Sequence, residues 1–225
     1  MSLDNDLVDL IAVNVAQPEV IGTRRGKPVS SAIKKRRTVT DGTLTLTETN
    51  LDGDRQADLR VHGGPEKAVY AYPSEHLPRW NAELQPDEPF GPGTFGENLT
   101  TAGWLETEVR IGDVWAWGDA RLQVCQPRYP CFKLAMATER PQVGKRMLET
   151  GRNGWYLRVL QPGEVPVAGP ITVIERGPDD ATVLDAVRAL LPGSSRELTE
   201  RLASVERLAA SWRAMLLDHL SAMDD

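Results

Sequence analysis

The chain has 225 residues, of which 40% are hydrophobic and 26% are charged, and this balance is typical of a globular protein rather than a disordered one. Its net charge of −6 argues against nucleic acid or an anionic membrane as its main partner, so any anion site must be a local basic patch. Two cysteines, no apolar leader and no long apolar run predict a reducing, cytoplasmic setting without a membrane span.

Alternation of apolar and polar residues predicts a mainly β domain. The strands expected from this period of two are 7–15, 43–47, 68–72, 109–117, 121–124, 155–159 and 171–174. A polar, glycine-bearing loop is expected after the first strand, and Gly118-Asp119 is expected to close a hairpin. One short helix is expected between strands, capped by Ser74 and carrying His76 on its surface.

After residue 176 the apolar residues recur with a helical period. Three short helices are therefore expected at the C-terminal end, the second of them starting with a capping box at 194–197. We interpret their apolar faces as core and packing surface. The sequence predicts a β barrel or sandwich over residues 7–176 and a three-helix module over residues 177–225.

Both cysteines lie in the stretch 124–134, in which prolines disfavour a helix around Cys131. Arg128 on one side and Lys133 on the other favour a thiolate, the form that acts as a nucleophile or as a ligand for a soft metal. An inert buried cysteine is the alternative interpretation.

A second candidate site surrounds the paired glycines Gly63 and Gly64, which let backbone N–H groups approach a ligand closely. His62 and Lys67 flank them, although His62 is equally compatible with a structural role. The basic run 34–37 is either a solvated face or an anion clamp.

The stretch 93–99 is a third candidate, and it begins in a loop rich in glycine and proline. Asn98 offers both a donor and an acceptor at the mouth of this loop. Glu97 is either a proton carrier or the partner of a nearby arginine.

Three motifs are much more specific together than any one alone. They are His62-Gly63-Gly64-Pro65-Glu66-Lys67-Ala68-Val69-Tyr70, Gly93-Thr94-Phe95-Gly96-Glu97-Asn98-Leu99 and Gln126-Pro127-Arg128-Tyr129-Pro130-Cys131. In this order they resemble the MOSC domain (molybdenum cofactor sulfurase C-terminal domain), in its YiiM-like branch. The resemblance runs from about Ala32 to Glu175, and the terminal helices resemble the 3-alpha module of that branch. It implies a β-barrel-like domain followed by a small three-helix module.

The resemblance also implies an oxidoreductase that binds the molybdenum cofactor (molybdopterin) and reduces N-hydroxylated compounds such as 6-hydroxylaminopurine, with no need for pyridoxal phosphate. It makes Cys131 the metal ligand, while Asn98 or His62 would orient the substrate or an oxo group. The residues expected to bind the cofactor are Lys34, Lys35, Arg36, His62, Gly63, Gly64, Lys67, Glu97, Asn98, Arg128, Cys131 and Arg152.

A separate reductase is expected to deliver electrons, because the chain has neither a Gly-x-Gly-x-x-Gly motif after a strand nor a four-cysteine set. The alternative from another class is a non-catalytic carrier that binds the cofactor, or passes sulfur to it, through Cys131. A cysteine hydrolase that uses Cys131 with His62 is a weaker hypothesis, because no third group is evident to orient the base.

Cys125 is expected to be structural, with a Cys125–Cys131 disulfide as a minor alternative. The oligomeric state stays open, with a homodimer as one option.

Overall fold

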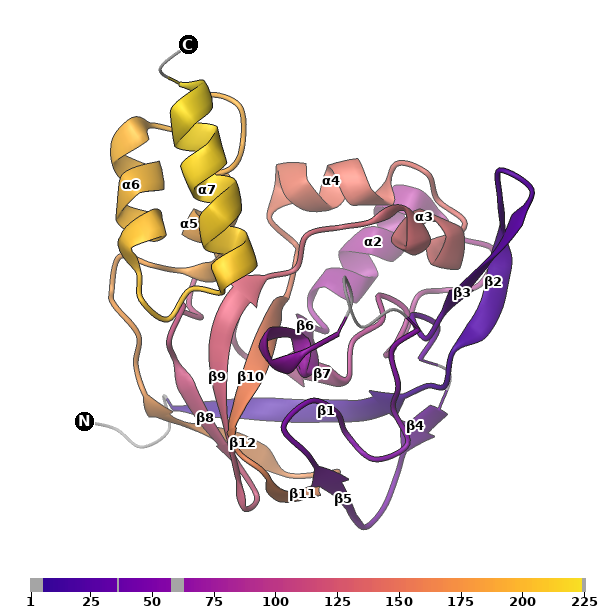
Figure 1. The fold of residues 1–225 in the computed structure, drawn as a ribbon. Coiled ribbons are helices and arrows are strands. Elements are labelled where there is room, and N and C mark those ends of the chain that lie inside the picture. Colours follow the sequence, from indigo (N-terminus) through magenta and orange to yellow (C-terminus); the bar gives the residue numbers. More distant parts are fainter. Residues whose placement is uncertain (1–5, 36, 58–62, 224–225) are drawn as a thin grey trace.

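The computed structural model describes residues 6–35, 37–57 and 63–223 (Figure 1). The strands are β1 (Leu7–Val15), β2 (Glu19–Arg24), β3 (Lys27–Ser31), β4 (Arg37–Val39), β5 (Thr43–Leu46), β6 (Val69–Pro73), β7 (Leu99–Ala102), β8 (Val114–Trp117), β9 (Ala120–Pro127), β10 (Trp155–Gln161), β11 (Gly163–Pro166) and β12 (Pro170–Glu175). The helices are η2 (Pro65–Lys67), α2 (His76–Leu84), α3 (Phe132–Thr138), α4 (Val143–Thr150), α5 (Val183–Arg188), α6 (Arg196–Ser204) and α7 (Ala210–Ala222).

Seven of the described strands close into a barrel. They are hydrogen-bonded in the order β12-β8-β9-β10-β6-β7-β1, and β1 pairs back with β12. β6 and β7 run parallel, whereas the other neighbours in the ring run antiparallel. Closure pairs both edges of the sheet, and a mainly apolar core fills the inside. The predicted β-barrel-like fold is confirmed.

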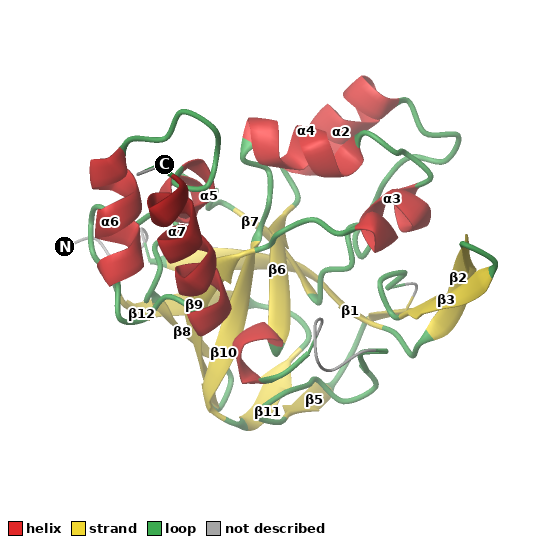
Figure 2. Ribbon diagram, turned by 45° about the horizontal axis from the view of Figure 1, so that its top comes forward, coloured by secondary structure: helices red, strands yellow, loops and turns green. Residues whose placement is uncertain are grey.

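The C-terminal helices α5, α6 and α7 pack beside β8 and β9 on one side of the barrel (Figures 1 and 2). The backbone N–H of Ala209 donates to the carbonyl oxygen of Cys125 at 2.8 Å, and the N–H of Ala210 donates to the Glu66 carboxylate at 3.2 Å. Trp212 and Leu216 are buried in the same apolar cluster as the barrel interior. The helices therefore share the core of the barrel, and their independence as a domain stays a prediction.

A second apolar cluster lies under α2, α3 and α4, over one end of the barrel (Figure 2). Phe95 is fully buried there, stacked on Tyr72 with ring centroids 4.8 Å apart. The hydroxyl of Tyr72 accepts a 2.6 Å hydrogen bond from the Trp80 indole. This packing fixes the loop that contains the 93–99 motif.

Three local predictions, for the loop after β1, for His76 and for Ser74, are wrong. The expected loop after β1 is the β2–β3 hairpin, whose mostly exposed residues give it no apolar alternation. His76 is buried rather than exposed, and its Nε2 lies 2.8 Å from Oε2 of Glu106. Ser74 does not cap α2, since the N-cap residue is Glu75.

The capping box predicted at 194–197 is also wrong. Ser195 caps α6 by accepting from the N–H of Leu198, whereas the reciprocal pair of a capping box belongs to Thr182 and Asp185 at the start of α5. The sequence analysis also missed β4, β7, β11, α3 and α4. Most of these elements are too short to show a clear period.

Candidate functional site

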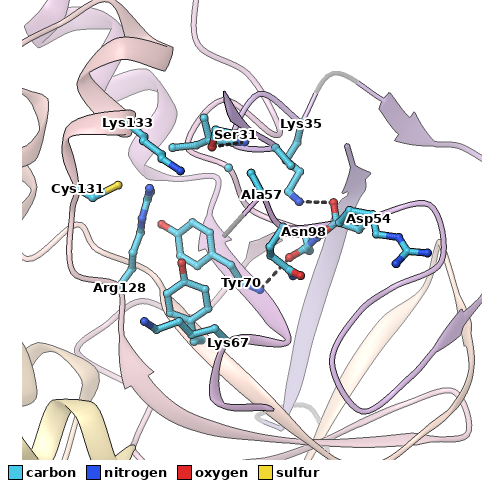
Figure 3. Close-up of a pocket in the computed structure, with 16 residues that line it drawn as sticks. Ser31, Lys35, Asp54, Ala57, Lys67, Tyr70, Asn98, Arg128, Cys131 and Lys133 are labelled. Atoms are coloured by element: carbon cyan, nitrogen blue, oxygen red, sulfur yellow. Dashed lines mark hydrogen bonds and ion pairs between the residues drawn. The ribbon is translucent and has the colours of Figure 1, made fainter. Parts of the chain in front are cut away.

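A pocket of about 580 Å³, its open mouth included, lies where the end of β9 meets the starts of β6 and β10. The described residues that line it are Ser31, Ala32, Ile33, Lys35, Asp54, Arg55, Gln56, Ala57, Lys67, Tyr70, Gly96, Asn98, Arg128, Cys131, Lys133 and Tyr156. Figure 3 shows Cys131, Arg128 and Lys133 on one side and Lys35 with Asp54 on the other.

The first side of the pocket, which we call the thiol side, consists of Cys131, Arg128 and Lys133. Cys131 has extended backbone between β9 and α3, and its half-buried thiol forms no disulfide with Cys125. The Arg128 guanidinium donates to the carbonyl oxygen of Phe95 at 2.6 Å and lies 5.0 Å from the centroid of the Tyr70 ring. The Lys133 ammonium donates to the carbonyl oxygen of Ser30 at 3.1 Å. Within the described chain, neither cation is neutralised by a carboxylate in an ion pair.

Two tyrosines form the wall beside the thiol side, because β6 and β10 place Tyr70 opposite Tyr156 in register. Their ring centroids are 5.1 Å apart, and the Tyr70 hydroxyl donates to the carbonyl oxygen of Asn153 at 2.8 Å. Burial raises the pKa of both phenols, more than the attraction of Arg128 lowers it. Both hydroxyls therefore stay protonated at neutral pH.

Lys67 contributes a further cation from the end of η2. Burial lowers the pKa of its ammonium, and the Glu66 carboxylate and the two cysteine sulfurs oppose that shift. Lys67, Arg128 and Lys133 thus place three cations on the lining of the pocket that also contains the Cys131 thiol. The preference of Cys131 for the thiolate form stays a prediction.

The second side, which we call the ion-pair side, consists of Lys35, Asp54 and Asn98. The buried Lys35 ammonium forms an ion pair with Oδ1 of Asp54. Asp54 also accepts from the N–H of Ala16 at 2.8 Å and from the Asn98 amide at 3.0 Å. Three donors thus converge on the Asp54 carboxylate.

Asn98 lines the pocket, but its amide is already used by the fold. Its Oδ1 accepts from the N–H of Tyr70 at 3.1 Å, and its Nδ2 donates to Asp54 and to the carbonyl oxygen of Asn14 at 3.3 Å. Asn98 therefore ties β6 to the ion-pair side, and its predicted contact with a substrate stays a prediction.

Glu97 lies in the wall behind the pocket rather than among the residues that line it. Its carboxylate accepts from the N–H groups of Gly93 at 2.6 Å and Phe95 at 3.0 Å, and from the Thr100 hydroxyl at 3.1 Å. Burial raises the pKa of Glu97 to about 7, although these donors pull it down. Among the described residues, the hydrogen-bond partners of the Glu97 carboxylate include no arginine, and its contacts with Gly93 and Phe95 organise the 93–96 turn.

The structure does not bring every predicted cofactor residue to this pocket. Arg152 lies outside it, because its guanidinium pairs with Glu83 at 2.5 Å and stacks 3.8 Å from the Trp80 ring centroid. Lys34 lines a neighbouring groove instead. Gly63 and Gly64 are not among the lining residues, and Gly64, with a φ of 94°, opens the turn into η2. Arg36 and His62 lie outside the residues that the structure describes.

Sequence reasoning missed Asp54, Tyr70 and Tyr156 as pocket residues. No local pattern pairs Asp54 with Lys35, which lies 19 residues earlier in the chain. Tyr70 and Tyr156 meet through a strand register that spans most of the barrel sequence. The available signal was that Tyr70 ends the same motif that contains Lys67.

A family model described as the MOSC domain matches residues 58–172, which include η2, the 93–99 motif and Cys131. This chain belongs to the MOSC family. It is 39% identical to Protein YiiM of Escherichia coli over 203 residues, covering 89% of the chain and 88% of that relative. A crystal structure of YiiM from Geobacillus stearothermophilus superposes with a TM-score of 0.78 at 31% identity, covering 95% of this chain and 99% of the other.

A third MOSC relative, from Gibberella moniliformis, is named Reductase and is 39% identical over 168 residues. The match covers 73% of this chain and 29% of that relative. Among helices of the described residues, none is long and apolar enough to cross a membrane.

MOSC domains are in general associated with binding of the molybdenum cofactor, and the residues present fit that group. The described residues contain no cluster of three or more His, Cys, Asp or Glu side chains that could hold a metal by themselves. A half-buried thiol can instead add one soft ligand to a metal that brings its other ligands with it. The cations of the thiol side suit an anionic phosphate tail.

Proposed function

We propose that this chain binds the molybdenum cofactor in the pocket and reduces N-hydroxylated compounds with electrons from a separate reductase. The observation that carries the proposal is the half-buried Cys131 thiol on the wall of a cation-lined pocket in a MOSC protein. The relative named Reductase supports redox chemistry over a purely carrier role.

Cys131 would ligate the metal, and Arg128, Lys133 and Lys67 would hold the phosphate of the pterin. When bound, the cofactor supplies a two-electron redox centre next to Cys131. The overall reaction is R–NHOH plus two electrons and two protons, giving R–NH₂ and water. Tyr70 and Tyr156, which stay protonated, present a half-apolar wall against which a planar base can pack.

The test compares the chain's two cysteines in protein made by a host that synthesises the cofactor. Metal and pterin analysis, followed by reduction of 6-hydroxylaminopurine with reduced methyl viologen, gives two independent readouts. We expect wild type to carry molybdenum and to turn over, and Cys131→Ser to lose the metal and turnover. Cys125→Ser is the matched control, since Cys125 is fully buried away from the pocket and should keep both.

Wild-type protein that holds molybdenum and pterin but reduces no hydroxylamine would overturn the catalytic proposal. Retention of the pterin by Cys131→Ser, together with transfer of cofactor to a cofactor-free enzyme, would establish the carrier function instead. Hydrolysis of acyl esters by metal-free protein would point to the cysteine hydrolase.

A further inference from the structure

The buried ion pair of Lys35 and Asp54 faces the pocket rather than a closed core. A buried pair of this kind contributes little to net stability, because the desolvation of two charges offsets their attraction. Such a pair on the wall of an open pocket instead indicates a role towards a ligand. Figure 3 places it across the pocket from Cys131.

The two members of the pair are bound unequally. Asp54 is satisfied by the Lys35 ammonium, the N–H of Ala16 and the amide of Asn98. The Lys35 ammonium carries three N–H donors, and within the described chain Asp54 is its one hydrogen-bond partner. The Lys35 ammonium can therefore donate further hydrogen bonds to a ligand at the pocket wall.

The backbone holds Lys35 in place. Its N–H donates to the carbonyl oxygen of Ile33 at 3.1 Å. A Cβ on Gly93 would come within 2.3 Å of the Lys35 carbonyl oxygen, so the 93–96 turn packs directly on this backbone. Asp54 then fixes the end of the side chain. Lys35 is thus positioned as a rigid donor, which a flexible surface lysine is not.

Lys35 is poorly suited to the phosphate role expected from the sequence, because Asp54 neutralises its charge. We propose, resting on the proposed function, that Lys35 is the proton donor to the oxygen of the substrate's N–O bond, with Asp54 positioning it. The N–O bond breaks, two equivalents of a low-potential one-electron donor are oxidised to supply the two electrons, and the Lys35 proton leaves on the oxygen as part of water. A second proton, from solvent, goes to the nitrogen, and solvent reprotonates Lys35.

The electrostatics of the site are compatible with this role. Burial lowers the pKa of the Lys35 ammonium, and the carboxylates of Asp54 and Glu97 oppose the shift by attraction. A lysine whose pKa moves down from its ordinary value releases its proton more readily near neutral pH. Besides the pair itself, the charged residues among the described lining of the pocket are Arg55, Lys67, Arg128 and Lys133.

The test uses Lys35→Arg and Lys35→Met in cofactor-loaded protein, with methyl viologen as donor and 6-hydroxylaminopurine as substrate. Arginine keeps the charge and the pair with Asp54 but does not give up a proton. We expect both variants to lose about 100-fold or more in kcat, while Lys35→Arg retains the wild-type pterin content and KM. The alkaline fall of kcat in wild type should be absent from Lys35→Arg.

Control variants distinguish loss of the proton donor from a folding defect and from failure of the proposed reductase activity. Lys145→Met, on an exposed part of α4, should match wild type, and Lys35→Met/Asp54→Asn removes both charges if Lys35→Met alone does not fold. Calorimetric binding of 6-hydroxylaminopurine to cofactor-free protein should be unchanged in Lys35→Arg. Wild-type kcat in Lys35→Arg would overturn the proton-donor role, and loss of pterin from Lys35→Met/Asp54→Asn would restore the phosphate role. An inactive but loaded wild type would overturn the proposed function itself.

Discussion

The two sides of the pocket hold their cations in opposite ways. On the thiol side, Arg128 and Lys133 donate to the backbone carbonyl oxygens of Phe95 and Ser30, so their positive charge remains available. On the ion-pair side, Asp54 cancels the charge of Lys35. The first arrangement suits attraction of an anion, and the second suits a fixed donor with no net charge. The number of basic residues around a pocket therefore does not determine its electrostatic potential, because a carboxylate can cancel some of their charges.

The largest expected effect is on the ion-pair side. Asp54→Asn leaves Lys35 buried without a counter-charge and should lower the free energy of unfolding by about 3–5 kcal/mol. Denaturant titration measures it, with Asp52→Asn in the same turn as the exposed control. Equal stability of the two variants would show that the pair is solvated and would remove the contrast between the two sides.

Glu97 gives a pH test of the wall behind the ion-pair side. Its folded pKa of about 7 lies above the ordinary value of 4.5, so the folded state binds more protons than the unfolded state between these pH values. The free energy of unfolding should therefore fall by about 3 kcal/mol as pH rises through this window and level off above it. Glu97→Gln should lack this contribution in urea titrations from pH 4 to 8. Parallel curves for the two proteins would contradict the raised pKa.

The thiol side is tested by Arg128→Gln. Loss of a charged hydrogen-bond donor should weaken binding of an anion by about 1.5–3 kcal/mol, seen as lower pterin content and weaker binding of pyrophosphate by calorimetry. The double variant Lys35→Met/Asp54→Asn provides the comparison, since it removes a pair with no net charge and should leave pyrophosphate affinity unchanged. Equal losses in the two variants would mean that both sides attract the anion.

Glu83→Gln should have the smallest effect. It removes the partly exposed partner of Arg152, and pairs of this kind contribute up to about 1 kcal/mol. Thermal unfolding should show a shift of a few degrees or less, and pterin content should match wild type because Arg152 lies outside the pocket. A loss of pterin would support the predicted role of Arg152 in binding the cofactor.

The sequence alone was enough to predict the barrel and the terminal helices, and it singled out the segment of Cys131, whose half-buried thiol lines the pocket in the structure. Alternation marks strands with one buried face, a helical period marks the module, and prolines with nearby cations mark the reactive segment, all of them local signals. The family resemblance added the expected chemistry to these signals.

Only the tertiary structure decided which cations share the pocket. Lys35 meets Asp54, Tyr70 meets Tyr156 and Arg152 meets Glu83 through contacts between residues distant in sequence. A side chain's charge is written in the sequence, but whether a partner cancels it depends on distance and burial in the folded chain. For that reason the sequence grouped Lys35, Arg128 and Arg152 as equivalent cations, whereas the fold gives them three different environments.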